Sequence, residues 1–409
     1  MSESRVELTP IVIVGAGPVG LIAALAARHA GLPVVVLEKA AEDAVRSGSR
    51  ATYLFRESLD LLEAIAPAVT KDLIALSGQW VALRTTYRSK TVFAKTFRPA
   101  APGAFGISVP QPDQEKVLRQ RCKQEGVNFC WGDGVANAAT DSQGVTLTLE
   151  SGAGIRAAYV LAADGASSSV RTTLGGMDLE GERSETAFII VDTAALDPDA
   201  PELKERAFHY NHPAVGGRNV LMVPFGGGLR IDLQCFPEDD AEHWQSLEHV
   251  KKWVTAVAGA QYTQNILWVS TYRFNRSVAA SFTDRHRRVL LAGEAAHLFP
   301  PFGGGRGLNS GIPDAVFAVE AIAQALRGSD GESAWRLIDG VATERRAAAL
   351  ANRAEANKAL VRMEAKSLYR KLQRHLAAKL APHLPAFGVW LDRSPTGGSS
   401  RRVTARSRF

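Results

Sequence analysis

The residues that most strongly suggest chemistry lie near the N-terminus, in the run Gly15-Ala16-Gly17-Pro18-Val19-Gly20. Gly15 permits a tight turn, Gly17 lets the backbone approach a pyrophosphate, and Gly20 lets a helix pack closely on a strand. The run follows an apolar stretch and opens an alanine- and leucine-rich one, so helix N-terminal amides would face the phosphates. Glu38, with Lys39 beside it, closes the next apolar run and can accept hydrogen bonds from an adenosine ribose. The pattern predicts a dinucleotide site without distinguishing NAD from FAD.

Two later blocks end an apolar run in the same way, with glycine next to an acid. The first runs from Tyr159 through Asp164-Gly165 to Arg171, and the second from Arg288 through Gly293-Glu294 to His297 and on to Asn309. In this order and approximate spacing, the three blocks resemble the class A FAD-dependent aromatic monooxygenases typified by para-hydroxybenzoate hydroxylase, with their "DG" and "GD" motifs. The resemblance covers most of the first 325 residues and favours FAD.

The resemblance implies a set of cofactor-binding residues. Asp164 and Gly165 would lie in the groove of the cofactor and the pyridine nucleotide. Glu294 would bind a ribityl hydroxyl, and Pro300 would lie against the ring. Arg50 would approach the FAD phosphates and NAD(P)H, and Gln111 the ribityl chain. The complete set is Gly15, Gly17, Pro18, Val19, Gly20, Glu38, Lys39, Arg50, Gln111, Asp164, Gly165, Gly293, Glu294, Pro300, Gly305, Arg306, Gly307, Leu308 and Asn309.

The glycine-rich turn at 303–307 also has a physical reason to lie beside a flavin. Its backbone N–H groups can stabilise the negative charge on the N1–C2=O edge of a reduced flavin, along which Gly307, Leu308 and Asn309 would lie. The sequence departs from the family pattern here: Glu294 replaces an aspartate, and the segment 302–307 has one glycine more. Because Pro313 lacks an N–H, we expect it in the first turn of the following helix.

The implied activity is hydroxylation of an aromatic small molecule, with FAD, O₂ and NADH or NADPH, through a flavin C4a-hydroperoxide. No catalytic base is evident; His209, Tyr210 and His212 are candidates for a base, and Arg230 is a further candidate catalytic residue. Arg230 is either a flavin neighbour or a member of a buried ion pair near Asp232. His297 is interpreted as packing beside the cofactor loop. Four aromatic side chains of the strand-rich region could line an apolar substrate pocket: Phe188, Phe225, Phe236 and Trp268.

Other functions remain open at this stage. A related flavin reductase or oxidase would share the motifs, as would a halogenase, although no Trp-x-Trp-x-Ile-Pro segment occurs. A protein that binds FAD without turnover is the alternative from a different class. No metal site is expected, because none of the three cysteines lies in a Cys-x-x-Cys pair.

The elements that must position these residues form an interrupted α/β pattern. Parallel-sheet signals occur at the N-terminus, near 160 and near 290, with strand-rich sequence between them. We therefore expect a doubly wound, Rossmann-like FAD-binding domain, an interleaved antiparallel β-sheet substrate domain and C-terminal helices. The expected boundaries are 1–79, 105–181 and 283–335 for the first, 80–104 and 182–282 for the second, a helical region at 336–393 with a long helix over 342–379, and a flexible basic tail at 394–409.

Composition bounds the partners. The 409 residues carry a net charge of +6, but residues 341–409 alone carry +11 and the rest −5. The basic end reads as a helix packed on the body with a solvated charged face, and no nucleic-acid motif accompanies it. We expect no specific nucleic acid, no transmembrane segment or thioredoxin-like extension, a monomer or homodimer, and a cytoplasmic location, since three cysteines cannot form a disulfide framework.

Overall fold

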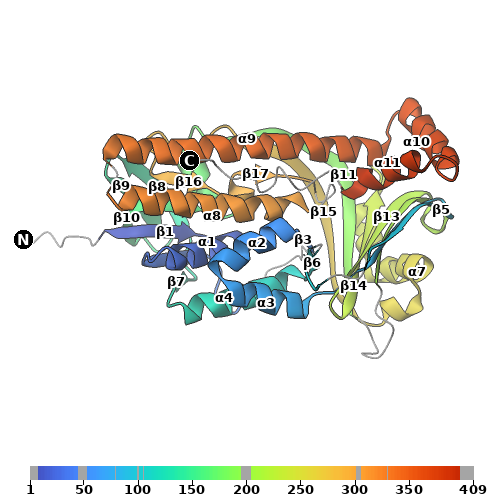
Figure 1. The fold of residues 1–409 in the computed structure, drawn as a ribbon, viewed down its shortest axis with the longest axis horizontal. Helices are drawn as coiled ribbons and strands as arrows, with labels where there is room; N and C mark the ends of the chain where they lie inside the picture. The colour runs from blue at the N-terminus through green and yellow to red at the C-terminus, as the bar shows by residue number, and fades with distance from the viewer. Residues whose placement is uncertain are drawn as a thin grey trace, which may run out of the picture.

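The protein is described here by a computed structural model, which covers residues 8–44, 53–78, 80–98, 101–104, 106–194, 204–300, 305–328 and 330–396. Two β-sheets lie side by side, and one long helix, α9 (Gly331–Glu364), runs along both (Figure 1). The sheets are built by segments that alternate along the chain, which is the interleaved α/β architecture expected from the sequence.

The first sheet has the doubly wound character of a nucleotide-binding domain. Its strands are, in spatial order, β7 (Asn128–Trp131), β2 (Val34–Glu38), β1 (Thr9–Val14), β10 (Gly154–Ala162), β9 (Gly144–Leu149) and β8 (Val135–Asp141), with β16 (Val289–Leu291) also on β10. Strands β7, β2, β1, β10 and β16 are parallel. Residues Ile11–Val14 are all buried, as expected of a parallel strand covered on both faces. The carboxyl ends of these strands therefore meet at one edge.

Helices surround this sheet. They are α1 (Pro18–His29), α2 (Arg56–Ile65), α3 (Pro67–Leu76), α4 (Gln111–Gln124), α5 (Ser169–Leu174) and α8 (Arg306–Leu326). Helix α1 packs on both α4 and α8, and α8 packs on α9. A small ribbon of β3 (Tyr53–Leu54) and β6 (Ile107–Ser108) joins the domain to the second sheet.

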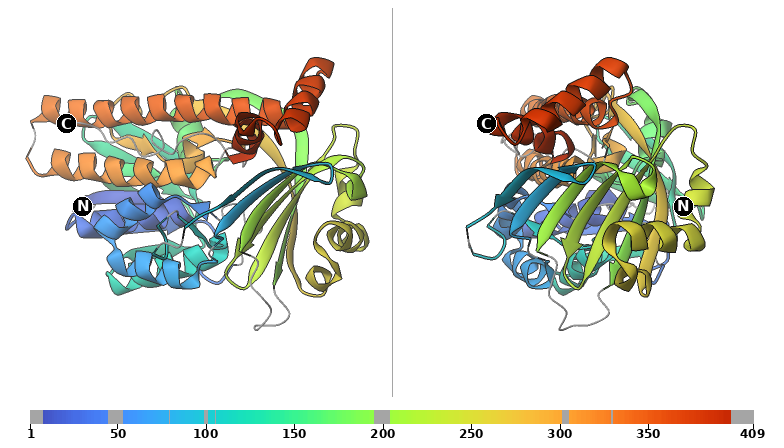
Figure 2. Two further views of the ribbon diagram at one scale, coloured as in Figure 1. Left: turned by 45° about the vertical axis from the view of Figure 1, so that its right-hand side comes forward. Right: turned by 90° about the vertical axis from the view of Figure 1, so that its right-hand side faces the viewer.

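The second sheet has eight strands and separates the first domain from α7 (Leu247–Ala258) (Figures 1 and 2). Its order is β17 (His297–Leu298), β15 (Ile266–Ala279), β11 (Leu179–Ala194), β14 (Gly228–Cys235), β13 (Arg218–Phe225), β12 (Glu205–His212), β4 (Ala82–Tyr87) and β5 (Lys90–Thr96). The expected antiparallel pairing holds except between β12 and β4, which are parallel. These two strands are distant in sequence, so no hairpin imposes opposite directions on them.

The two faces of the second sheet differ in chemistry. One face buries Ile189, Val191, Ile231 and Leu233 against Val250, Trp253 and Val254, the last three on α7. The opposite face carries Asp192, Arg230 and Asp232, because side chains alternate along each strand. Short α6 (Ala241–Gln245) precedes α7. The polar face of the sheet thus turns toward the first domain.

The C-terminal helices correct two expectations. The single helix expected over 342–379 is two helices, α9 and α10 (Leu368–Leu380), because Ala365 adopts the left-handed conformation (φ 45°) and ends α9. The expected tail from 394 begins inside α11 (Pro385–Thr396); residues beyond 396 lie outside the described part. The inward face of α9 is apolar with a few buried polar residues, but α10 exposes Leu368, Leu372 and Leu376 rather than a purely charged face.

Pro313 also lies elsewhere than expected. Helix α8 starts at Arg306, so Pro313 is inside the helix and not in its first turn. The missing N–H removes one helical hydrogen bond there. Asn309, in the first turn of α8, anchors the start of the helix to the β3 segment, because its side chain donates to Tyr53 O and accepts from Phe55 N. None of the described helices is long and apolar enough to cross a bilayer.

Candidate functional site

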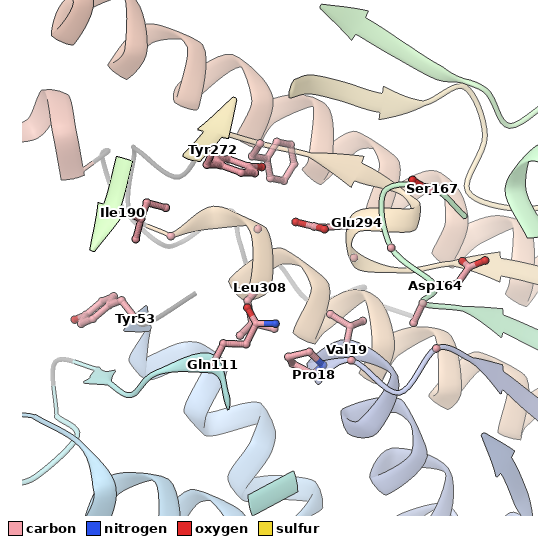
Figure 3. A pocket seen from close by; sticks show the side chains of 18 of the residues that line it. Pro18, Val19, Tyr53, Gln111, Asp164, Ser167, Ile190, Tyr272, Glu294 and Leu308 are labelled. Atoms are coloured by element: carbon pink, nitrogen blue, oxygen red, sulfur yellow. The ribbon is translucent and has the colours of Figure 1, made fainter. Parts of the chain in front are cut away.

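A cavity of about 1070 Å³ lies between the carboxyl ends of the parallel strands and the polar face of the second sheet. This volume lies just above the usual range for small-molecule sites, about 300–1,000 Å³, so the cavity can hold a cofactor together with a small substrate. Figure 3 shows Pro18, Val19, Asp164 and Ser167 from the first domain, and Tyr53, Ile190 and Tyr272 on the other side of the space.

The first glycine-rich turn has the conformation that the spacing predicts. Gly15 has φ +100°, and a Cβ there would lie 2.5 Å from the Ala163 carbonyl oxygen. A Cβ on Gly20 would lie 1.9 Å from the Gly15 oxygen, so only glycine lets α1 approach this turn. Gly17 caps the N-terminus of α1 and lines the cavity together with Pro18. The turn leaves the positive end of α1 directed at the cavity.

Glu38 lines the cavity at the end of β2, where the sequence predicts an acid for a ribose. Its Oε2 accepts a hydrogen bond from Ala16 N at 2.7 Å and its Oε1 from Ala40 N at 3.0 Å. The carboxylate therefore holds the glycine turn in place. Each oxygen has a second lone pair, so Glu38 can still accept from a ligand hydroxyl. Lys39 lines the cavity beside it.

Asp164 follows β10, and its carboxyl group lies at the wall of the cavity. Oδ2 accepts from Val170 N at 3.3 Å, whereas Oδ1 is buried with no hydrogen-bond partner among the described residues. Burial raises the pKa of Asp164, although hydrogen bonds from Ser168 and from the Val170 backbone act in the opposite direction. A buried oxygen without a partner is costly unless a ligand satisfies it. Asp164 and the adjacent Gly165 thus fit a bound polar cofactor.

The third motif, around Gly293 and Glu294, is supported by a buried ionic network. Asp314 accepts hydrogen bonds from His297 Nε2 at 2.7 Å, Arg345 Nε at 2.8 Å and Gly293 N at 3.2 Å. His297 is fully buried and stacks on Phe299, in agreement with its interpretation as packing. The network fixes the turn that carries Glu294, whose side chain projects into the cavity (Figure 3).

The N-terminus of α8 faces the cavity with backbone rather than with polar side chains. Gly305, in the left-handed region with φ +65°, lines the cavity together with Gly307, Leu308 and Pro300. Arg306 instead donates to Asn352 Oδ1 at 2.7 Å and does not line the cavity. Asn309 uses its side chain on Tyr53, Phe55, Ser58 and Gly305, so it positions the turn without lining the cavity.

Two other predicted cofactor residues have different outcomes. Gln111 lines the cavity at the start of α4, and its Nε2 donates to Glu115 Oε1 at 2.9 Å. Arg50 lies outside the described residues. Gly20 does not line the cavity and serves the packing of α1.

The weak candidates for a catalytic base do not reach the cavity. His209 is opposite Val220, on the face of the second sheet that turns away from the cavity; Thr86 contacts its Nδ1, and burial lowers its pKa to about 4. His212 does not line the cavity either. The Tyr210 hydroxyl donates to Leu391 O at 2.9 Å beneath α11. Residue type and position in the sheet insert suggest these three residues, but strand register turns His209 away from the cavity and α11 covers Tyr210.

Arg230 does line the cavity, as part of a buried ion pair. Its Nε and Nη2 donate to the two carboxylate oxygens of Asp192, each at 2.8 Å. The interpretation as a buried pair is therefore right, with Asp192 as the partner. Asp232 and Arg206 line the same floor. The alternation in Leu229-Arg230-Ile231-Asp232-Leu233 was the sequence signal for a polar sheet face.

Aromatic side chains line the cavity, but not the ones named from the sequence. Tyr53, Phe55, Trp80, Tyr272 and Phe299 do so. Tyr53 is in contact with both Phe55 and Trp80, at ring distances of 5.5 and 5.2 Å. Phe188, Phe225, Phe236 and Trp268 do not line it. Most of the aromatic wall comes from Tyr53 and Phe55 in and after β3 and from Trp80, which lies two residues before β4.

These features together suit a long dinucleotide with a polar and an apolar end. Glycine turns, an α1 N-terminus and unsatisfied Asp164 offer groups for pyrophosphate and hydroxyls, and the α8 N-terminus offers amides beside an aromatic wall. Within the described ranges, no group of three or more His, Cys, Asp or Glu side chains could hold a metal ion. The site therefore fits FAD at the position that the three motifs predicted.

Comparison with known proteins bears on this assignment. Residues 8–356 match the family model described as "FAD binding domain". A rifampicin monooxygenase of Rhodococcus hoagii is 26% identical over 365 residues, covering 83% of this chain and 68% of that protein. A 3-(3-hydroxy-phenyl)propionate/3-hydroxycinnamic acid hydroxylase 1 of Burkholderia vietnamiensis is 28% identical over 353 residues, covering 82% of this chain and 53% of that protein. The chain thus spans about half to two thirds of these relatives' lengths.

Among solved structures, the p-nitrophenol 4-monooxygenase PnpA from Pseudomonas putida DLL-E4 is similar over its whole length. It aligns with a TM-score of 0.76 and 20% identity, covering 96% of this chain and 99% of that one. At this identity the likeness concerns the fold alone.

Proposed function

This chain belongs to the class A family of FAD-dependent monooxygenases, and from that premise we propose that it hydroxylates a small aromatic molecule with NAD(P)H and O₂. The observation that carries the proposal is one continuous cavity. It joins the glycine turns that suit FAD to a wall containing Tyr53, Trp80 and Tyr272. Aromatic rings stack favourably on such side chains, so an aromatic substrate is the natural occupant of that end.

In this proposal the protein binds and orients, and FAD, reduced by NAD(P)H, supplies the activation of O₂. Gly15, Gly17 and the N-terminus of α1 would hold the pyrophosphate. Asp164 and Glu294 would accept hydrogen bonds from cofactor hydroxyls, which would satisfy Oδ1 of Asp164. Amides at the start of α8 would stabilise negative charge on the reduced cofactor.

The apolar part of the cavity then serves to exclude water from the reacting atoms. Pro300, Phe299 and Leu308 line it on the side of the first domain, and Ile190, Leu221 and Val223 on the side of the sheet. Exclusion of water would limit side reactions of the activated oxygen, such as its loss as hydrogen peroxide. We therefore expect tight coupling of NAD(P)H consumption to hydroxylation when the correct substrate is bound.

The test begins with the purified chain reconstituted with FAD. A panel of phenols and heteroaromatics is scored for substrate-stimulated NADH or NADPH oxidation, and products are analysed by mass spectrometry under ¹⁸O₂. A product that gains one ¹⁸O atom supports the monooxygenase. Reduction that yields only hydrogen peroxide with every compound would favour a reductase or oxidase, and a halide-dependent product a halogenase. A protein that stays yellow but accepts no electrons would be a binding protein.

A matched variant isolates the cofactor site. Gly17→Val places a branched side chain at the cavity wall beside the α1 N-terminus, where the backbone conformation (φ −74°, ψ 177°) accepts valine. We expect a folded, colourless protein without NAD(P)H oxidation. A variant that stays yellow and active would contradict the pyrophosphate placement.

Further expectations accompany this function. We propose domain segments of 1–79, 105–181 and 283–335 for FAD and of 80–104 and 182–282 for the substrate. The three cysteines are unpaired, which supports a cytoplasmic location. A monomer or homodimer, and the absence of a nucleic-acid partner, remain predictions.

A further inference from the structure

The floor of the cavity, on the second sheet, holds more buried charge than an apolar substrate pocket requires. Arg230 is paired with Asp192, with side chains only 4% and 5% exposed. Arg206 is paired with Asp392 from α11, at 3.5 Å. Both arginines therefore already face a carboxylate, and neither is available as the main partner of an anionic substrate.

Asp232 is the remaining acid of this floor. It lies opposite Ile190 and Leu221 on the neighbouring strands, and all three residues line the cavity. The residue is 6% exposed, and its Oδ1 is buried without a hydrogen-bond partner among the described residues. Figure 3 shows the position of Ile190, its neighbour, at the cavity wall beside Tyr53 and Tyr272. A buried carboxyl oxygen in a binding cavity needs a donor, and the ligand is the group that can bring one.

The surroundings of Asp232 bring the pKa of its carboxyl group close to neutral pH. Burial raises the pKa of Asp232 to about 7, with Arg230 lowering it and Asp192 raising it. Four other titratable or charged groups lie at this end of the cavity or pair with a residue there, each on a different element: Arg206 on β12, Asp392 on α11, Tyr272 on β15 and Tyr53 on β3. A carboxyl group with this pKa changes protonation state in the working range of an enzyme.

We propose that Asp232 is a substrate-contacting catalytic residue: its carboxylate binds a ring hydroxyl of the aromatic substrate and accepts the hydroxyl proton. This inference rests on the proposed function and names its substrate class, an aromatic compound with a hydroxyl group directed at the sheet and no carboxylate there.

The step balances as a proton transfer. The O–H bond of the substrate breaks, an O–H bond forms on Asp232, and the electron pair stays on the substrate oxygen. The resulting oxyanion increases the electron density of the ring, which favours attack on an electrophilic oxygen. A hydroxyl that ionises near pH 10, like that of tyrosine, would keep its proton in the resting complex and donate a hydrogen bond to the Asp232 carboxylate, whereas a hydroxyl more acidic than Asp232 would transfer its proton.

The experiment measures binding to the FAD-loaded protein, without turnover. The probes are 2-naphthol, its methyl ether 2-methoxynaphthalene and 2-naphthoate, titrated between pH 5.5 and 8.5 and followed by the flavin absorbance. Because a hydrogen bond to a charged acceptor is stronger than one to a neutral acceptor, naphthol affinity should rise about tenfold with pH. Affinity for the methyl ether should not rise, and naphthoate should bind about tenfold more weakly than naphthol.

Two variants assign the effect to the residue. Asp232→Asn cannot titrate, so the pH dependence of naphthol binding should vanish while FAD stays bound. Gln234→Ala is the matched control, because Gln234 is on the same strand and face but does not line the cavity; it should keep the wild-type pH profile. Asp232→Glu keeps a carboxyl group at this position and should therefore restore part of the pH dependence of naphthol binding. If Asp232 had only a structural role, the pH dependence would not follow the presence of a carboxyl group.

The outcomes that overturn the inference are specific. They are equal affinity of the wild type for naphthol and its ether at pH 8.5, tighter binding of naphthoate than of naphthol, or an unchanged pH profile in Asp232→Asn. If Asp232→Asn fails to fold, the wild-type comparison of the three probes still decides. If binding behaves as expected but no compound on the phenol panel gains ¹⁸O, hydroxyl recognition stands and hydroxylation fails.

Discussion

Asp314→Asn should be among the most damaging isosteric substitutions near the site, although Asp314 does not line the cavity. The carboxylate is about 1% exposed and holds Arg345 at 2.8 Å and His297 at 2.7 Å. The amide variant keeps the shape but removes the charge that compensates buried Arg345. Removal of one partner from a buried ion pair costs about 3–5 kcal/mol. Because a domain is stabilised by only about 5–15 kcal/mol, we expect a large part of the total stability to be lost.

The assay is urea unfolding of the FAD-free protein, with FAD affinity as a second readout. Asp314 also fixes the Gly293 amide, so the cofactor turn should loosen and FAD should bind more weakly. Asp339→Asn is the matched control, since its ion pair with Arg287 is partly solvent-exposed at 34% and 22% and is worth less than about 1 kcal/mol. Equal losses in the two variants, or a loss below about 1 kcal/mol in Asp314→Asn, would refute the reasoning.

A pH series sharpens this prediction. Burial opposes ionisation, but Arg345 and His297 hold the pKa of Asp314 below its usual range. A depressed carboxyl pKa contributes stability above the unfolded-state pKa, and this contribution is lost as the pH falls through the folded-state pKa. The difference between wild type and Asp314→Asn should therefore be full at pH 7 and shrink in acid.

Three further outcomes are expected. Gly15→Ala, whose Cβ would meet Ala163 O at 2.5 Å, should weaken FAD binding at least about tenfold by flavin fluorescence titration, whereas Gly31→Ala, also at positive φ but with no neighbour within 4 Å, should bind normally. Asn309→Ala leaves part-buried backbone groups of Tyr53, Phe55 and Gly305 without their partner and should cost about 1–3 kcal/mol in thermal unfolding, and an unchanged melting temperature would contradict this. Because burial raises the pKa of Asp232 from 3.8 to about 7, its contribution to stability is full below about pH 4 and is lost as the pH rises through about 7. The wild type should therefore lose up to about 4 kcal/mol of stability over this range. Asp232→Asn should show no such decline when unfolding is measured from about pH 4 to about pH 8.

The cofactor half of the site could be predicted because its chemistry is local. The first two motifs are each a strand, a turn and a helix start within about ten residues. The positive φ of Gly15 and the close approach of Gly20 to the Gly15 oxygen are local, whereas a Cβ on Gly15 would also meet Ala163 of the second motif. Parallel strands then bring the ends of β1, β10 and β16 to one edge. Strand placement followed from apolar runs, and the break at Ala365 was missed because alanine normally continues a helix.

The substrate half depends on register between strands that are distant in sequence. Whether His209 or Asp232 faces the cavity is a matter of one residue in the alternation, and only pairing with Val220 and Leu221 decides it. Likewise, Tyr53 joins the wall through the β3–β6 ribbon and Trp80 through its ring contact with Tyr53, which no local pattern indicates. The amino-acid sequence by itself determined the fold class and the FAD-binding turns, since short-range sterics specify them. The tertiary structure decided which buried charges are paired and which face the substrate, since long-range packing sets both.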